Sequence, residues 1–238
     1  MRRLLALFHG VARCLKWGAL LVVGVFLAAQ LWFMGWIFWW KHNPPQETSF
    51  MRLRLDELRE KDPAARLRWQ WMPYDEISTQ LKRALIAAED ARFVDHEGFD
   101  WRGIQLAIEK NQEKGRFVAG GSTISQQLAK NLFLNPGRSV LRKGQEALIT
   151  LMLEAVWDKK RILEVYLNAI EWGNGVFGAE AAARHYYQTS AARLSAPQAA
   201  RMAAMVPNPR YYDRHRNARG LRGKTDIILK RMPVAQLP

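Results

Sequence analysis

The chain has 238 residues, enough for one domain with a sizeable core and one further segment. Its formal charge of +14 indicates an anionic partner, but zinc-finger spacings and aromatic RNA-binding motifs are absent, so we expect no nucleic acid. The single cysteine, Cys14, excludes an intramolecular disulfide. Neither HExxH nor GxxxxGKS/T occurs, so the sequence has no dedicated zinc motif and no phosphate-binding P-loop, and no SxxK set supports serine acyl transfer.

Residues 17–40 contain no charged side chain. As a helix this run is about 36 Å long, which exceeds a hydrocarbon core of about 30 Å. A cleaved signal peptide is the alternative, but its apolar region spans only about 7–15 residues. We therefore predict an uncleaved transmembrane signal-anchor helix.

The flanking charges predict the orientation of this helix. Four basic residues precede it and one follows closely: Arg2, Arg3, Arg13 and Lys16 before, Lys41 after. By the positive-inside rule, residues 1–16 form a cytoplasmic N-terminus and the rest of the chain lies outside, facing anionic lipid. We predict a linker at 41–49 and one outer domain at 50–238.

The outer domain has mainly helical periodicity. The segment 67–72, "LRWQWM", alternates apolar and polar residues and predicts a short strand or extended segment. A helix follows, with Asp75 and Ser78 as capping groups and an apolar face that includes Leu81 and Leu85. Another helical pattern surrounds 104–108, and the polar, glycine-rich segment 109–121 predicts a mobile loop.

The second half continues this pattern. We predict a helix at 140–156, continued helical structure at 159–168, a glycine-rich loop at 171–178 and a helix at 179–187. In the next helix, Ser195 and Gln198 occupy capping-box positions. The fold class is therefore mainly α.

Two carboxylates are candidates for chemistry. Glu89 borders an apolar helix stripe, where desolvation would raise its pKa toward that of a general base, but a surface pair with Arg83 or Arg92 is the simpler alternative. Glu146 has Arg142 four residues before it, so a helix-surface ion pair also explains it.

The stretch 120–133, "GGSTISQQLAKNLF", combines an apolar stripe with a polar face. The stripe is formed by Ile124, Leu128 and Leu132, and a plain amphipathic helix accounts for it. The near absence of acidic residues and the preceding Gly120 and Gly121 favour an anion-facing helix that another backbone or a ligand approaches closely. Cations follow at Lys130, Arg138, Arg142 and Lys143, a set suited to phosphate.

Five segments in order resemble the motifs of the family-51 glycosyltransferases, the peptidoglycan polymerases. They are EDARFVDHEGFDW, GGSTISQQLAKNLFL with Ser125 where threonine is common, RKGQEALITLMLE, KKRILEVYLNAIEWGNGVFGAEAAARHYY and the more divergent LSAPQAARMAAMVPNPRYY. About thirty residues follow the last motif, so the chain resembles the monofunctional type, without a transpeptidase domain.

The resemblance implies a lysozyme-like helical domain at the bacterial cytoplasmic (inner) membrane, in a periplasmic position. The implied reaction is inverting transfer of a growing glycan strand from undecaprenyl diphosphate to the 4-hydroxyl of lipid II. Implied partners are lipid II, the glycan strand, the membrane and cell-division or cell-wall synthesis proteins. No cofactor is required by the sequence, and a divalent metal (Mg²⁺ or Mn²⁺) is compatible with the diphosphate.

Carried over by position, Glu89 resembles the general base and Glu146 the second essential carboxylate. Lys130 and Arg138 resemble the cations that stabilise the leaving diphosphate. Further substrate contacts are expected at Ser122, Gln126, Arg142 and Lys143. A lytic glycan hydrolase and an inactive precursor-binding scaffold are the alternatives.

Overall fold

The computed structural model describes residues 2–115, 120–137 and 139–238, and these form two compact units, Met1–His42 and Asn43–Pro238. The first unit is the helix α1 (Arg2–Trp40). Its Arg13–Trp40 part is long and apolar enough to cross a membrane, which is compatible with the predicted anchor. Because the helix begins at Arg2, it extends through most of the segment predicted as a separate N-terminus.

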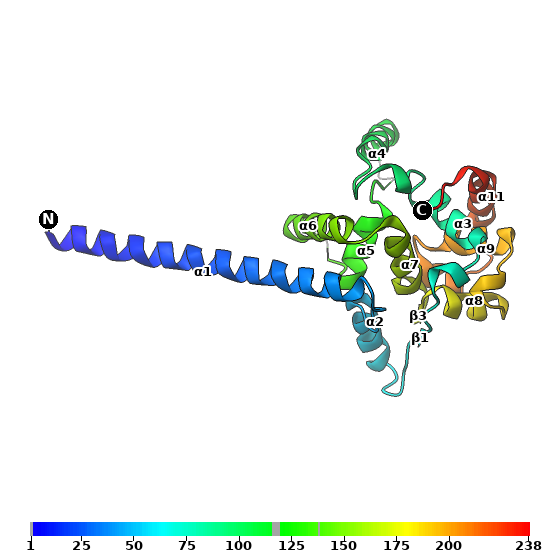
Figure 1. The fold of residues 1–238 in the computed structure, drawn as a ribbon, viewed down its shortest axis with the longest axis horizontal. Coiled ribbons are helices and arrows are strands. Elements are labelled where there is room, and N and C mark those ends of the chain that lie inside the picture. Colours follow the sequence, from blue (N-terminus) through cyan, green and yellow to red (C-terminus); the bar gives the residue numbers. More distant parts are fainter. Residues whose placement is uncertain (1, 116–119, 138) are drawn as a thin grey trace. The chain divides into compact units, whose positions relative to one another are not determined.

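The second unit is predominantly helical, as predicted (Figure 1). Its α-helices, in chain order, are α2 (Ser49–Arg59), α3 (Thr79–Glu89), α4 (Trp101–Lys114), α5 (Ile124–Phe133), α6 (Val140–Val156), α7 (Lys159–Ala169), α8 (Ala179–Tyr187), α9 (Ala196–Met205), α10 (Pro209–Arg214) and α11 (Leu221–Arg231). Short 3₁₀ turns are η1 (Tyr74–Glu76), η2 (Phe93–Asp95), η3 (Ala191–Arg193) and η4 (Met232–Val234).

A small sheet of β1 (Arg68–Trp69), β2 (Glu171–Gly173) and β3 (Val176–Phe177) has the order β1-β3-β2. β1 lies parallel to β3, and β2 and β3 form an antiparallel hairpin. Of the predicted strand or extended segment at 67–72, Arg68–Trp69 form β1, whereas the prediction of a loop throughout 171–178 is wrong. The hairpin turns at Asn174-Gly175, with Gly175 at φ +67°. An Asn-Gly pair is a strong signal for a hairpin turn, but the prediction counted only the glycines of this segment and so assigned a loop.

Two groups of helices build the core of the second unit. In one, α3 packs against α9 and α11, and Leu81, Leu85 and Met202 are fully buried. In the other, α5 packs against α6 and α7, as Figure 1 shows in green. The predicted apolar stripe of α5 is confirmed, since Ile124 and Leu128 are fully buried. Glu89 ends a helix of the first group and Lys130 lies on a helix of the second.

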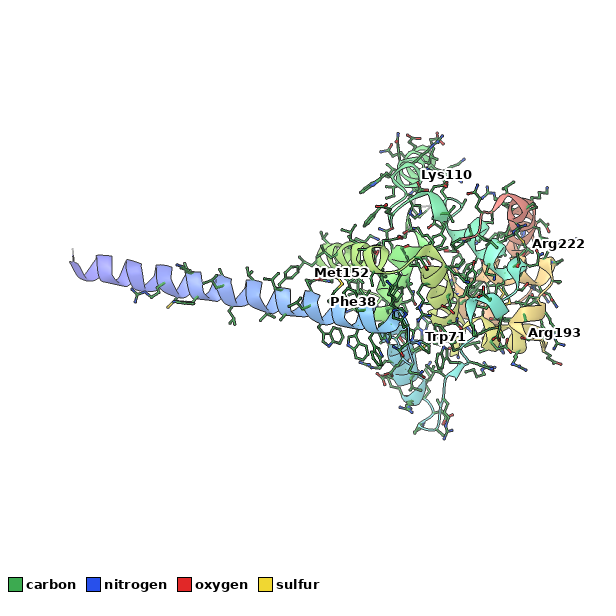
Figure 2. The ribbon with its side chains drawn as sticks, in the orientation of Figure 1. Phe38, Trp71, Lys110, Met152, Arg193 and Arg222 are labelled. Carbon is green, nitrogen blue, oxygen red and sulfur yellow. The ribbon has the colours of Figure 1, made fainter. Side chains whose placement is uncertain are left out.

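Other predicted boundaries need correction. The helix α4 continues to Lys114 and ends at Gly115, which has φ +59°, so 109–114 is helical rather than a loop; 116–119 lie outside the described residues. Strong helix formers such as Glu109 and Lys110 outweigh the polarity of this stretch; Lys110 projects from α4 in Figure 2. The linker ends at Thr48, the N-cap of α2, and neither α2, α10 nor α11 was predicted.

Candidate active site

Glu89 is the last residue of α3, and its half-buried side chain faces α5. Its Oε2 accepts a hydrogen bond from Nε2 of Gln127 at 2.9 Å. Burial raises the pKa of Glu89, and the charge of Asp90 acts in the same direction, while the Gln127 hydrogen bond and the charges of Lys130 and Lys224 lower it. Among the described residues no ion pair joins Glu89 to an arginine, and Arg92 instead pairs with Asp95 and Asp100. The surface-pair alternative is therefore wrong, and the environment suits a general base.

A cavity of about 210 Å³ lies against Glu89. Alanines of α3 and α9 line one part of it, and Lys224, Ile227 and Arg231 of α11 line another. Lys224 also donates to the hydroxyl of Tyr212 at 3.1 Å. The cavity therefore places an acidic group and two cations around a small apolar space. Lys224 and Arg231 were missed from the sequence because α11 has a weak periodic pattern and only the fold brings it to α3.

Asp90, next to Glu89, joins three segments. Its carboxylate accepts hydrogen bonds from Nε2 of His96 at 3.0 Å and from the backbone N–H of Ile124, the first residue of α5, also at 3.0 Å. Thr123 completes the junction by donating its hydroxyl to the carbonyl oxygen of Gly98 at 2.7 Å. The end of α3 and the start of α5 are thus tied together, which fixes Glu89 relative to Gln127.

The start of α5 is held by its own capping groups. Thr123 is the N-cap, and Gln126 completes a capping box with its Oε1 accepting from the Thr123 N–H at 3.1 Å. Gln126 is 4% exposed, whereas Ser122 is exposed. A Cβ on Gly121 would meet the Cα of Ile104 at 3.2 Å, so this glycine allows close approach of α4. Substrate contacts by Ser122 and Gln126 stay predictions.

Lys130 lies one helical turn beyond Gln126 and faces charges of both signs. Burial lowers the pKa of its ammonium group, the charges of Glu146 and Glu89 raise it, and those of Arg142 and Lys143 lower it. The ammonium nitrogen lies 5.6 Å from the centroid of the Phe50 ring on α2. Among the described residues no carboxylate forms a direct ion pair with Lys130. This half-buried cation is thus available to an anion.

Glu146 is buried, at 3% exposure, and holds two cations of its own helix. Nη1 of Arg142 donates to its Oε2 at 2.7 Å, and Nζ of Lys143 donates to its Oε1. The predicted pair with Arg142 is present, but at a buried position rather than on the surface. Within the described residues Nε of Arg142 is buried without a hydrogen-bond partner, which leaves a donor for an anion. Arg138 lies outside the described residues, so its role stays a prediction.

Metal-binding geometry is not found in the part of the chain that the structure describes. No group of three or more His, Cys, Asp and Glu side chains gathers there. Both carboxylate oxygens of Glu146 already accept from cations. These residues do not form a ligand set that would hold a divalent ion by themselves.

The arrangement can perform one kind of chemistry well. A carboxylate with a raised pKa can accept a proton, while a separate set of cations, Lys130 with Arg142 and Lys143, can stabilise a departing anion. The hydrogen bonds at Asp90 and Thr123 connect these two sets through α5. Among the described residues the other two carboxylates here, Asp90 and Glu146, already accept hydrogen bonds, so the arrangement suits a leaving group that needs no protonation.

Comparisons with known proteins identify the family of this chain. A family model described as Transglycosylase matches residues 56–233. Proteins called biosynthetic peptidoglycan transglycosylase are similar to this chain. The one from Dechloromonas aromatica is 68% identical over 228 residues, covering 96% of this chain and 99% of the relative. Those from Chromobacterium violaceum and Laribacter hongkongensis are 64% and 61% identical, covering 91% and 94% of this chain and 95% and 100% of the relatives. The chain belongs to the transglycosylase family.

Proposed function

We propose that this protein is a peptidoglycan glycosyltransferase that extends glycan strands from lipid II. The names of its relatives support the peptidoglycan product. The single observation that carries the reaction type is the half-buried carboxylate of Glu89, which accepts a hydrogen bond from the Gln127 amide and is not ion-paired with the cations that Glu146 holds.

In the proposed reaction Glu89 accepts the proton of the 4-hydroxyl of the acceptor sugar. The hydroxyl oxygen forms a bond to the anomeric carbon of the donor strand, and the bond from that carbon to the diphosphate oxygen breaks with inversion. Diphosphate is a good leaving group, so Lys130, Arg138 and Arg142 need only stabilise its charge. The proton stays on Glu89 until solvent removes it.

Glu146 has a different role in this proposal. By accepting from Arg142 and Lys143, it holds these cations beside Lys130 and keeps the unpartnered Nε of Arg142 available to a diphosphate oxygen. Divalent metal, where it assists, comes with the diphosphate rather than from a protein ligand set.

The location follows from α1 and from the substrate. We propose that Arg13–Trp40 spans the bacterial cytoplasmic (inner) membrane with the N-terminus in the cytoplasm, so that the second unit meets lipid-linked substrate outside. Contacts with cell-division or cell-wall synthesis proteins belong to the same proposal.

Polymerisation of purified lipid II by the full-length chain, with and without Mg²⁺ or Mn²⁺, tests this function. We expect long glycan strands and free undecaprenyl diphosphate. Soluble fragments released from finished peptidoglycan, without polymer from lipid II, would instead identify a hydrolase. Lipid II binding without product would identify a scaffold. Topology is checked separately, by protease access to the second unit in intact spheroplasts.

A further inference from the structure

A chain of hydrogen bonds lies behind Glu89 and crosses three helices. The hydroxyl of Tyr166 on α7 donates to Oε1 of Gln127 on α5 at 2.7 Å. Nε2 of Gln127 then donates to Oε2 of Glu89 on α3 at 2.9 Å. Tyr166 is 0% exposed, and Gln127 is its hydrogen-bond partner among the described residues. The sequence does not reveal this chain, because its members are separated by 38 and 39 residues.

The donors and acceptors of this hydrogen-bond chain follow one direction, from Tyr166 to Glu89. A glutamine amide offers an acceptor on one side and a donor on the other, whereas a carboxylate only accepts. If the amide of Gln127 turned over, its oxygen would face the Glu89 carboxylate. The phenol proton of Tyr166 would then be buried without an acceptor, which is costly. The hydroxyl of Tyr166 therefore selects the orientation in which Gln127 donates to Glu89.

Tyr166 is suited to this task because it stays a donor. Burial raises the pKa of Tyr166 well above its ordinary value, and the charges of Glu89 and Asp90 raise it further. The phenol thus stays protonated, and able to donate, beyond the pH at which a free tyrosine ionises. Among the described residues, Oε1 of Glu89 has no hydrogen-bond donor, so it is the oxygen left for a substrate hydroxyl.

We propose that Tyr166 is a positioning residue for the proposed reaction: it fixes the amide of Gln127, which holds Oε2 of Glu89 and leaves Oε1 to accept the proton of the acceptor hydroxyl. This inference rests on the proposed role of Glu89 as the base. Tyr166 itself touches neither substrate nor the reacting atoms.

The charged groups around Glu89 indicate how removal of the Tyr166 hydroxyl would change the pKa of Glu89. Asp90 is adjacent in sequence, Lys130 faces it from α5, and Lys224 and Arg231 line the cavity from α11. These charges stay in place when the Tyr166 hydroxyl is removed. What changes is the Gln127 hydrogen bond, which lowers the pKa of Glu89. Its loss raises that pKa, so the active carboxylate form appears only at higher pH.

The test measures lipid II polymerisation by full-length Tyr166→Phe across pH. We expect kcat to fall about tenfold with KM nearly unchanged, and the acid limb of the kcat profile to move up by about one pH unit. The matched control is Tyr74→Phe. Tyr74 is also buried, at 6% exposure, but its hydroxyl donates to the carbonyl oxygen of Pro238 at 3.3 Å, so its profile should match that of the unaltered protein.

A second variant keeps the proposal falsifiable if Tyr166→Phe unfolds. Gln127→Ala should move the acid limb in the same direction, and adding Tyr166→Phe to it should change the limb no further, because the two residues act through one bond. Independent, additive shifts would overturn the proposal. So would a lower kcat with an unmoved acid limb, because that result assigns Tyr166 to packing alone.

Glu89→Gln separates failure of this proposal from failure of the proposed function. If Glu89→Gln is inactive while Tyr166→Phe has an unaltered profile, only the positioning role is lost. If Glu89→Gln polymerises lipid II normally, the base assignment falls, and the positioning role falls with it.

Discussion

The glutamate at the end of α3 is half-buried and the one in the second turn of α6 is buried, and their carboxylates have different hydrogen-bond partners. Glu89 accepts one hydrogen bond from a neutral amide, and burial raises its pKa. Glu146 accepts from the cations of Arg142 and Lys143. A carboxylate held by an amide retains affinity for a proton, whereas one held by two cations serves to position them. The partners of each carboxylate thus support two different roles.

The largest expected effect is at Glu89. Glu89→Gln keeps the size of the side chain but cannot accept a proton, so we expect polymerisation to fall by about 1000-fold or more. Because a half-buried, partly desolvated charge is removed, stability to urea should be unchanged or slightly higher. A rate within tenfold of the unaltered protein would contradict the base assignment.

Removal of the Lys130 cation should have the second largest effect on polymerisation. Lys130→Met removes the charge and keeps an apolar stem, and we expect kcat to fall about 100-fold because the departing diphosphate loses one stabilising group. The control is Lys61→Met, an exposed lysine beyond the end of α2, which should leave polymerisation unchanged. Equal effects of the two variants would show that Lys130 has no specific role.

The third prediction concerns Glu146, whose replacement by glutamine should lower the stability of the protein. Glu146→Gln leaves Arg142 and Lys143 without their shared carboxylate, so we expect a loss of about 1–3 kcal/mol in the free energy of unfolding. Activity should fall by about tenfold, because the cations are displaced rather than removed. Urea unfolding beside polymerisation measures both. If Glu146→Gln and Glu89→Gln change stability equally, the contrast between the two glutamates is wrong.

The smallest expected effect is in the pH dependence of kcat/KM for the unaltered protein. The carboxylate of Glu89 is the active form and its pKa is raised, so the acid limb of kcat/KM should lie above about 4.3, the ordinary value for glutamic acid. The ammonium of Lys130 is the active form and its pKa is lowered, so the alkaline limb should lie below about 10.4. Activity therefore falls on both sides of a window narrower than free side chains would give. Acid and alkaline limbs at the ordinary pKa values of glutamic acid and lysine would contradict the pKa shifts of Glu89 and Lys130.

Much of the fold could be predicted from local patterns. The bounds of α6 and α8, the Ser78 cap and the capping box at Ser195 and Gln198 agree with the structure, because periodicity and caps depend on residues a few positions apart. Predictions failed where composition competed with geometry, at the hairpin around Gly175 and in the second half of α4. They also failed where the pattern is weak, at α10 and α11.

The exposed charges contribute little to the definition of the candidate site. Arg193 and Arg222 are exposed on η3 and α11 (Figure 2), and such arginines raise the net charge without marking a site. The charges that define the candidate site, Glu89, Lys130 and Glu146, are instead wholly or partly buried. Burial could not be judged from the sequence for any of them.

The sequence by itself determined the helical class, the apolar N-terminal helix and the residue types available for chemistry, because these follow from periodicity, length and motif order. Only the tertiary structure decided which neighbours each of these residues has. It placed Gln127 and Tyr166 behind Glu89, Lys224 and Arg231 across its cavity, and two cations on Glu146. The physical reason is that a pKa and a hydrogen-bond orientation depend on groups brought together from distant parts of the chain, which local sequence does not encode.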